Sequence, residues 1–268
     1  MKKYYLKKEF MIGLVVVLAG ITISQGATSQ DITQIPIFEK MPTIWYVDDS
    51  GNNTNNGTSW KEAWRNINYA INNNAVMDGH TIRAGEGNYN ENVIIDKSLK
   101  IIGNGSGYTI IDGNHKCDVI KIIQDNVIIR EVTIKNSGPL SNGINVRAEN
   151  CQILMCSIND NYNGLNFLGL ECQNNSIKNC NIFNNDDTAI LFISKCEENT
   201  IEMCCIKDNP WGIVILEAEN NRIEDSTLKR HNKSGLVLQG QFSISLPSKG
   251  LQFQRFPPKR KSIIIFNF

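Results

Sequence analysis

Three consecutive stretches decide the fold: "NCQILMCSINDN" (150–161), "NNSIKNCNIFNN" (174–185) and "ENTIEMCCIKDN" (198–209). They are near-copies of one pattern, and weaker copies stand on either side at 126–137 and 220–231. The last aliphatic residue of each copy recurs after 24, 24, 24 and 22 residues, at Ile134, Ile158, Ile182, Ile206 and Leu228. A fixed period of this length indicates a repeat architecture.

Each copy leads through a short polar turn to a second apolar strand, such as "GLNF" (164–167) or "AILF" (189–192). Two or three short strands per unit, with no helical period, exclude helical repeats and βαβ units. A unit of this kind matches one coil of a parallel β-helix, in which equal positions stack about 4.8 Å apart. More divergent copies at 80–98 and 99–117 extend the series, so we expect an all-β solenoid of about seven or eight coils over residues 75–239.

The segment before the coils is expected to cover the open end of the solenoid. Residues 30–58 contain the strand pattern "IWYV" (44–47) and an Asn/Gly-rich loop. In residues 59–74, Ser59 and Glu62 form a capping box, and apolar residues recur at helical spacing. We therefore predict a short N-terminal capping helix over 59–74.

The two ends of the chain fall outside the repeat. Residues 1–29 place four lysines before an apolar run from Met11 to Ile23, which is typical of a secretory signal peptide and is too short for a comfortable membrane span. We expect a secreted, extracellular, cell-surface or periplasmic protein with no further transmembrane anchor. Residues 240–268 have no place in the period and are interpreted as a non-repeat tail, folded over the end of the solenoid or left by truncation of a longer ancestor.

The body of the chain is acidic, although the formal net charge is zero. Residues 30–248 contain 18 Lys and Arg against 26 Asp and Glu. Because nucleic-acid binding needs clustered basic residues, this balance argues against a nucleic-acid partner.

The order "YVDDSGNNTNNGTSWKEAW" (46–64), "GHTIRAGEGNY" (79–89) and "KSLKIIGNG" (97–105), followed by Asn-x-Ile repeats, resembles secreted right-handed parallel β-helix proteins of the pectin-lyase-like superfamily. The most similar group contains surface and periplasmic proteins whose repeats also occur in a copper-loading accessory protein. The resemblance covers residues 45 to about 239. It implies a right-handed solenoid and leaves the function open, because the superfamily hosts lyases, hydrolases, epimerases, adhesins and proteins of no known activity.

Asp186 and Asp187 stand side by side before an apolar strand, and paired carboxylates are what glycoside hydrolysis requires. With Asp160 and Asp208 on neighbouring coils they form an acidic corner, the candidate catalytic site of a polysaccharide lyase or glycoside hydrolase and a candidate calcium site. The resemblance to Asp-Asp glycosidases is partial, since the Asn-Thr-Asp, Gly-His-Gly and Arg-x-Lys elements of such enzymes are missing. The simpler interpretation is a repeated polar turn, which Asp and Asn favour.

Cys156, Cys180 and Cys204 share one repeat position, and Cys172 and Cys196 share another. Val, Ser and Ala fill these positions in other coils, so we expect small interior slots with free thiols rather than disulfides or a zinc site. The three histidines, at 80, 115 and 231, share no repeat position, which argues against copper handling.

Five sequons start at Asn52, Asn56, Asn104, Asn174 and Asn232 and are candidate glycosylation sites. No cofactor is expected apart from the calcium alternative. The sequence therefore favours a non-catalytic, exported scaffold that binds glycans or cell-envelope components. An enzyme at the acidic corner and a periplasmic copper accessory protein remain the alternatives.

Overall fold

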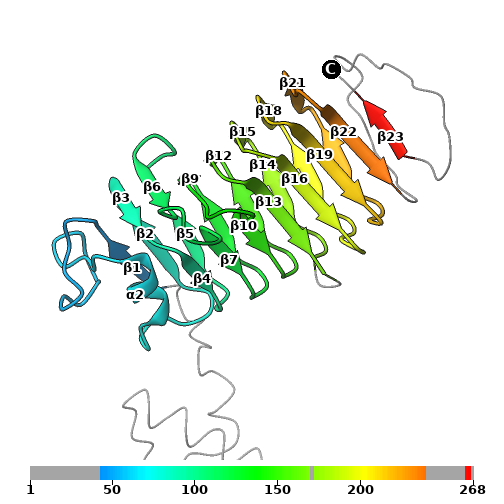
Figure 1. The fold of residues 1–268 in the computed structure, drawn as a ribbon. Coiled ribbons are helices and arrows are strands. Elements are labelled where there is room, and N and C mark those ends of the chain that lie inside the picture. Colours follow the sequence, from blue (N-terminus) through cyan, green and yellow to red (C-terminus); the bar gives the residue numbers. More distant parts are fainter. Residues whose placement is uncertain (1–42, 170–171, 240–262, 267–268) are drawn as a thin grey trace, which may run out of the picture. The chain divides into compact units, whose positions relative to one another are not determined.

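The computed structural model describes residues 43–169, 172–239 and 263–266. The predicted signal peptide and most of the predicted tail lie outside these residues. Within the described part, strands β2 to β22 form seven successive sets of three that follow β1, and Figure 1 shows the strands in order from the blue β1 to the orange β22. The predicted parallel solenoid is confirmed.

Equivalent strands of successive coils form three parallel sheets, here named A, B and C. Sheet A contains β1 (Ile44–Val47), β2 (Thr81–Ala84), β5 (Lys100–Ile102), β8 (Ile128–Arg130), β11 (Gln152–Leu154), β14 (Ser176–Lys178), β17 (Thr200–Glu202) and β20 (Arg222–Glu224). Sheet B contains β3 (Gly87–Asn90), β6 (Thr109–Asp112), β9 (Thr133–Lys135), β12 (Ser157–Asn159), β15 (Asn181–Phe183), β18 (Cys205–Lys207) and β21 (Thr227–Lys229). Sheet C contains β4 (Val93–Ile95), β7 (Ile120–Ile122), β10 (Asn142–Val146), β13 (Asn163–Leu168), β16 (Thr188–Ile193), β19 (Trp211–Leu216) and β22 (Ser234–Gln239), and β23 (Ile263–Phe266) pairs antiparallel with β22.

The interior consists of stacked aliphatic rows. In sheet B the repeat residues Ile134, Ile158, Ile182 and Ile206 lie in register and are fully buried. In sheet C, Phe167 and Phe192 stack with ring centroids 4.6 Å apart. Because each inward row buries its neighbours above and below, the period found in the sequence is the period of the core.

Buried asparagines hold one corner of the coils together. Asn161, Asn185 and Asn209 stack at the turn between sheets B and C, and each is at most 2% exposed. The Oδ1 atom of Asn185 accepts a hydrogen bond from the backbone N–H of Asn161 at 3.2 Å. The Oδ1 atom of Asn209 accepts one from the backbone N–H of Asn185 at 3.0 Å. A second stack, Asn175–Asn199–Asn221, serves the corner between sheets C and A. The amides replace the backbone pairing that the turns lack.

The N-terminal cap differs from its prediction. Helix α2 (Ile67–Asn72) is shorter than the segment 59–74 expected to be helical. Trp64 instead forms a parallel bridge with Val47 and stacks on Trp45 at 5.1 Å. This pairing extends the solenoid by one partial layer, so tertiary contacts outweigh the local helical pattern. No helix in the described residues is long and apolar enough to cross a membrane.

Candidate functional site

The predicted acidic corner lies where sheet B turns into sheet C. Asp160 and Asp208 occupy one row of left-handed residues, with φ angles of 56° and 57°. Asn136 and Asn184 fill the same row in the alternate coils, with φ angles of 59° and 53°. Asn and Asp adopt this conformation more readily than other non-glycine residues, so the backbone accounts for them here.

Asp186 and Asp187 lie in the turn that follows. The stacking of Asn185 on Asn161 puts Asp186 level with Tyr162. The turn between β15 and β16 has one residue more than the turn before it, and the second aspartate is that insertion. The side chain of Asp186 is exposed and makes no hydrogen bond with a described residue.

The other aspartates of the corner have separate partners. Asp208 accepts two hydrogen bonds of 2.5 Å from Arg230, which lower the pKa of its carboxyl group. Asp187 lies 3.4 Å from the Lys233 ammonium. The carboxylate of Asp160 accepts a 2.6 Å hydrogen bond from its neighbour Asn159. Each of the four aspartates therefore lies in its own surroundings at the surface of the turns, and they do not share a partner among the described residues.

Within the described ranges, no three His, Cys, Asp or Glu side chains come together in a way that could hold a metal ion. In the described part of the chain the corner thus lacks a converging set of three carboxylates for calcium.

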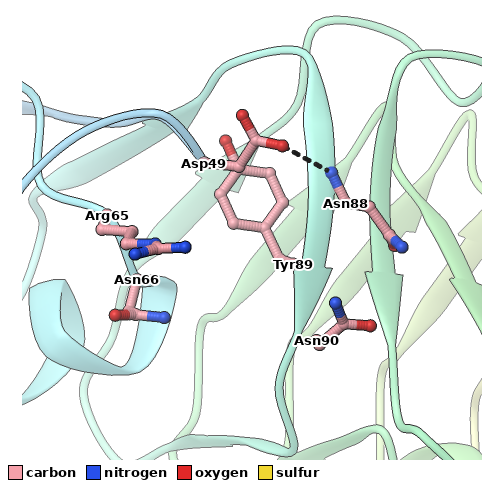
Figure 2. A pocket seen from close by; sticks show the side chains of 6 residues that line it. All are labelled: Asp49, Arg65, Asn66, Asn88, Tyr89 and Asn90. Carbon is pink, nitrogen blue, oxygen red and sulfur yellow. Dashed lines mark hydrogen bonds between the residues drawn. The ribbon is translucent and has the colours of Figure 1, made fainter.

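A polar hollow lies elsewhere, at the N-terminal end of sheet B. It has a volume of about 170 Å³ and is lined by Asp49, Arg65, Asn66, Asn88, Tyr89 and Asn90. Figure 2 shows Arg65 and Asn66 on one side, Asn88 and Asn90 of β3 on the other, and Asp49 beside the Tyr89 ring. It therefore joins three segments that are separate in the sequence.

Asp49 is held against β3 by a close backbone approach. Its carboxylate accepts the backbone N–H of Asn88 at 3.2 Å, and a Cβ atom at Gly87 would lie 2.3 Å from the Asp49 carboxyl carbon. Only glycine at position 87 leaves room for this carboxylate.

The opposite side is fixed by side-chain hydrogen bonds. The backbone N–H groups of Arg65 and Asn66 both donate to Asn53 Oδ1, at 2.9 and 3.2 Å. The buried carboxylate of Glu91 accepts the Asn66 amide at 3.3 Å and the backbone N–H of Ile67 at 2.9 Å. Glu91 thereby ties the first turn of α2 to the strand that carries Asn88 and Asn90.

Tyr89 supports the hollow from below. Its hydroxyl group lies 3.2 Å from the carbonyl oxygens of both Val47 and Gly85. Burial, together with the nearby charges of Asp48 and Asp49, raises the pKa of this phenol well above its ordinary value of 10.0. Tyr89 is thus a neutral anchor at physiological pH. The side chains that line the hollow provide amides, one carboxylate and one guanidinium, which are groups that can form hydrogen bonds with a ligand.

The comparisons with known proteins identify the fold family. A family model described as "Right handed beta helix region" matches residues 100–246. The chain belongs to this family. No curated protein sequence matches it significantly.

Three of the solved structures that resemble this chain carry the names of enzymes, and this chain covers less than two thirds of the length of each. The pectate lyase Pel9A is 17% identical with a TM-score of 0.65, over 76% of this chain and 61% of that chain. A rhamnogalacturonan lyase is 14% identical with a TM-score of 0.54, over 81% and 64%. The GH136 lacto-N-biosidase from Eubacterium ramulus is 13% identical with a TM-score of 0.55, over 68% and 44%. At these identities the likeness establishes the fold alone.

In this β-helix the repeated cysteines lie in the core, as predicted. Cys156, Cys180 and Cys204 are at most 3% exposed, and they are free thiols. Contact with Cys156 and burial raise the pKa of Cys180. These thiols are unreactive small hydrophobic side chains rather than metal ligands.

The histidines are dispersed over the β-helix. His80 is buried beside Trp45 in the N-terminal cap, His115 is exposed on a loop, and His231 lies in the last turn between sheets B and C. The five sequon asparagines, Asn52, Asn56, Asn104, Asn174 and Asn232, are all exposed, and their glycosylation stays a prediction.

Sequence reasoning missed the hollow. In the sequence its asparagines look like the many asparagines of the turns. Its two charged residues, Asp49 and Arg65, belong to the N-terminal cap rather than to the repeat. The available signal was "GEGNYNEN" (85–92), a strand with two outward asparagines next to a glycine.

Proposed function

We propose that this β-helix is an exported scaffold that binds glycans at the N-terminal hollow without cleaving them. The observation that carries the proposal is the polar hollow itself, with Asn88 and Asn90 offering amides beside Asp49 and Arg65. The charged and apolar pattern of residues 1–29 supports export.

The lining suits a ligand rich in hydroxyl groups. Each asparagine amide both donates and accepts hydrogen bonds, Asp49 accepts them and Arg65 donates them. The side chains of Asn88 and Asn90 are exposed and make no hydrogen bond with a described residue, so they are available to a ligand. Sugar hydroxyls combine donor and acceptor in the same way and therefore match this set.

Binding is favoured over hydrolysis because the lining of the hollow contains a single carboxylate, Asp49. Glycosidases use two carboxyl groups about 5–9.5 Å apart across the scissile bond. At the acidic corner Asp208 and Asp187 are engaged with Arg230 and Lys233. The lyases that share the fold have names that refer to pectate and rhamnogalacturonan, so these two polysaccharides are the first to be tested.

The test is a glycan array probed with the full chain, followed by calorimetric titration of the glycans that bind. The Asn88→Ala/Asn90→Ala double variant is expected to lose at least tenfold in affinity. Asn159→Ala serves as the matched control, since Asn159 faces outward from the same sheet but far from the hollow. Unchanged binding by the double variant, or no binding by the wild type, would overturn the proposal.

Turnover distinguishes the alternatives. Release of fragments from a bound polysaccharide that disappears in Asp186→Ala/Asp187→Ala would establish an enzyme at the acidic corner.

A further inference from the structure

The last strands of sheet C carry apolar residues on both faces. β16 reads "TAILFI" (188–193) and β19 reads "WGIVIL" (211–216). Their inward aliphatic and aromatic residues are at most 1% exposed. The residues that alternate with these are half-buried and point outward, namely Leu191, Ile193, Val214 and Leu216. In parallel sheets such near-continuous apolar runs are typical of strands that are covered on both faces. The outward face of these strands therefore has the composition of an interface.

The outward residues lie side by side across three strands. Leu191 is in register with Val214. Ile193 is in register with the exposed Leu168 on one side and with Leu216 on the other. We name these five residues the apolar strip, and it ends at Asn166, the polar neighbour of Leu191 in β13. With strands about 4.8 Å apart and alternate residues about 6.6 Å apart, the strip measures about 10 by 7 Å between its outermost Cα atoms. It therefore accommodates one extended segment.

Carboxylates flank the strip at both ends of its strands. Glu198, Glu217 and Glu219 lie in the turns that follow β16 and β19, and all three side chains are exposed. None of the three forms an ion pair among the described residues. Lys195 adds one positive charge to this side, and Asp186 is exposed before β16 begins. The rim of the strip is therefore negative.

A second copy of the chain fits this face poorly. Residues 30–248 carry 18 Lys and Arg against 26 Asp and Glu, so two copies repel each other when their acidic rims meet. The strip is also much smaller than the total of about 1,200–2,000 Å² that stable protein interfaces bury. A short basic partner avoids both costs.

We propose that the apolar strip binds an extended segment of another protein, in which two alternate apolar residues have Lys or Arg on either side. Apolar residues at positions i and i+2 of an extended chain lie about 6.6 Å apart, which is the spacing of the two rows of the strip. The basic residues reach the carboxylates at the two ends of the strands. Complementary charges across an interface speed association and select the partner. The proposal concerns sheet C and does not depend on glycan binding at the hollow.

The experiment measures the fluorescence anisotropy of three labelled peptides, KKLSLKK, EELSLEE and KKSSSKK, titrated with the full chain. We expect KKLSLKK to bind at least tenfold more tightly than either of the others, because it alone combines the apolar pair with basic ends. Raising NaCl from about 0.05 to 0.5 M is expected to weaken this binding at least threefold, since salt screens exposed charges.

Two double variants test the two parts of the surface. Leu191→Ser/Leu216→Ser, the strip variant, is expected to weaken KKLSLKK binding at least fivefold. Glu217→Gln/Glu219→Gln is expected to weaken it at least threefold and to reduce its dependence on salt. Phe183→Ser is the matched control, because Phe183 is a half-buried outward residue of sheet B, and it is expected to bind within twofold of the wild type. Thermal unfolding verifies that each variant is folded. If the strip variant is unfolded, the glutamine variant, which changes only exposed side chains, decides the test.

Equal binding of KKLSLKK and KKSSSKK, no binding of KKLSLKK, or equal losses in the strip variant and Phe183→Ser overturns the proposal. Carbodiimide coupling followed by peptide mass spectrometry identifies the occupant. A link between Glu217 or Glu219 and a lysine of the peptide supports the proposal. A link to a lysine among residues 249–261 of the same chain, or a dimer in sedimentation velocity that the strip variant abolishes, assigns the face to another occupant and overturns it.

Discussion

Replacing Asn185 by alanine tests the asparagine stack that holds the corner between sheets B and C. The Oδ1 atom of Asn185 accepts both the backbone N–H and the side-chain amide of Asn161, each at 3.2 Å. Its own amide donates to Asn209 Oδ1 at 2.9 Å and to the Ile158 carbonyl at 3.3 Å. The side chain is 2% exposed, so water does not replace these partners.

The expected loss follows from the groups left without partners. The amide of Asn161 keeps two carbonyl acceptors, at Ile134 and Asn159, but its backbone N–H loses its acceptor. One buried unsatisfied donor costs about 1–3 kcal/mol. The vacated carboxamide volume adds about 1 kcal/mol, so we expect about 2–4 kcal/mol in all. For a chain of this size that lowers the melting temperature by about 4–16 °C.

The assay is urea unfolding followed by circular dichroism, with thermal melting in parallel. Asn159→Ala is the control, because its half-exposed side chain faces outward and, among the described residues, forms hydrogen bonds with its near neighbours Asp160 and Ser157. That variant is expected to change stability by at most about 0.5 kcal/mol. Equal losses in the two variants would refute the claim that the buried amides hold the corner.

Three further predictions concern other residues. Burial lowers the pKa of His231 below 6.5, so the unfolded chain takes up a proton at this imidazole more readily than the folded chain. The protein is therefore expected to keep its full stability above pH 6.5 and to lose stability as the pH falls below that value. The His231→Asn variant is expected to show a smaller change in melting temperature between about pH 5 and 7.5. An equally steep profile in that variant would show that His231 is not responsible. The Tyr89→Phe variant loses the hydrogen bonds of the hydroxyl group with the Val47 and Gly85 carbonyl oxygens. Its free energy of unfolding in urea is expected to fall by about 0.5–1.5 kcal/mol, while its affinity for the sugar stays within twofold. A tenfold loss of affinity would contradict the anchoring role. Iodoacetamide is expected to modify the exposed Cys117 in the native protein and the buried Cys180 only after unfolding, and peptide mass spectrometry showing equal rates would contradict the stacked core.

The fold was predictable because each coil repeats the same inward positions. Ile158, Ile182 and Ile206 recur at the period of the stack, and the strands that carry them pair in exact register. The turns at Asp160 and Asn184 were also predictable, since Asp and Asn tolerate the left-handed conformation that these positions adopt. Repetition turns a weak local signal into a strong one.

The cap and the hollow were harder, because both depend on contacts between segments that do not repeat. Trp64 has the spacing of a helix residue but pairs with Val47, where the first layer of the solenoid provides a partner. Asp49 and Asn88 lie 39 residues apart and meet only because Gly87 lets the backbone approach. No local pattern contains such a juxtaposition.

The most direct test of the central claim is recovery of a bound oligosaccharide. The full chain is incubated with an oligosaccharide selected on the glycan array, and the ligand is separated and its length determined by mass spectrometry. We predict that the ligand is retained by the protein and recovered intact, with retention lost in Asn88→Ala/Asn90→Ala. Shortened products that vanish in Asp186→Ala/Asp187→Ala would contradict the account and place catalysis at the acidic corner.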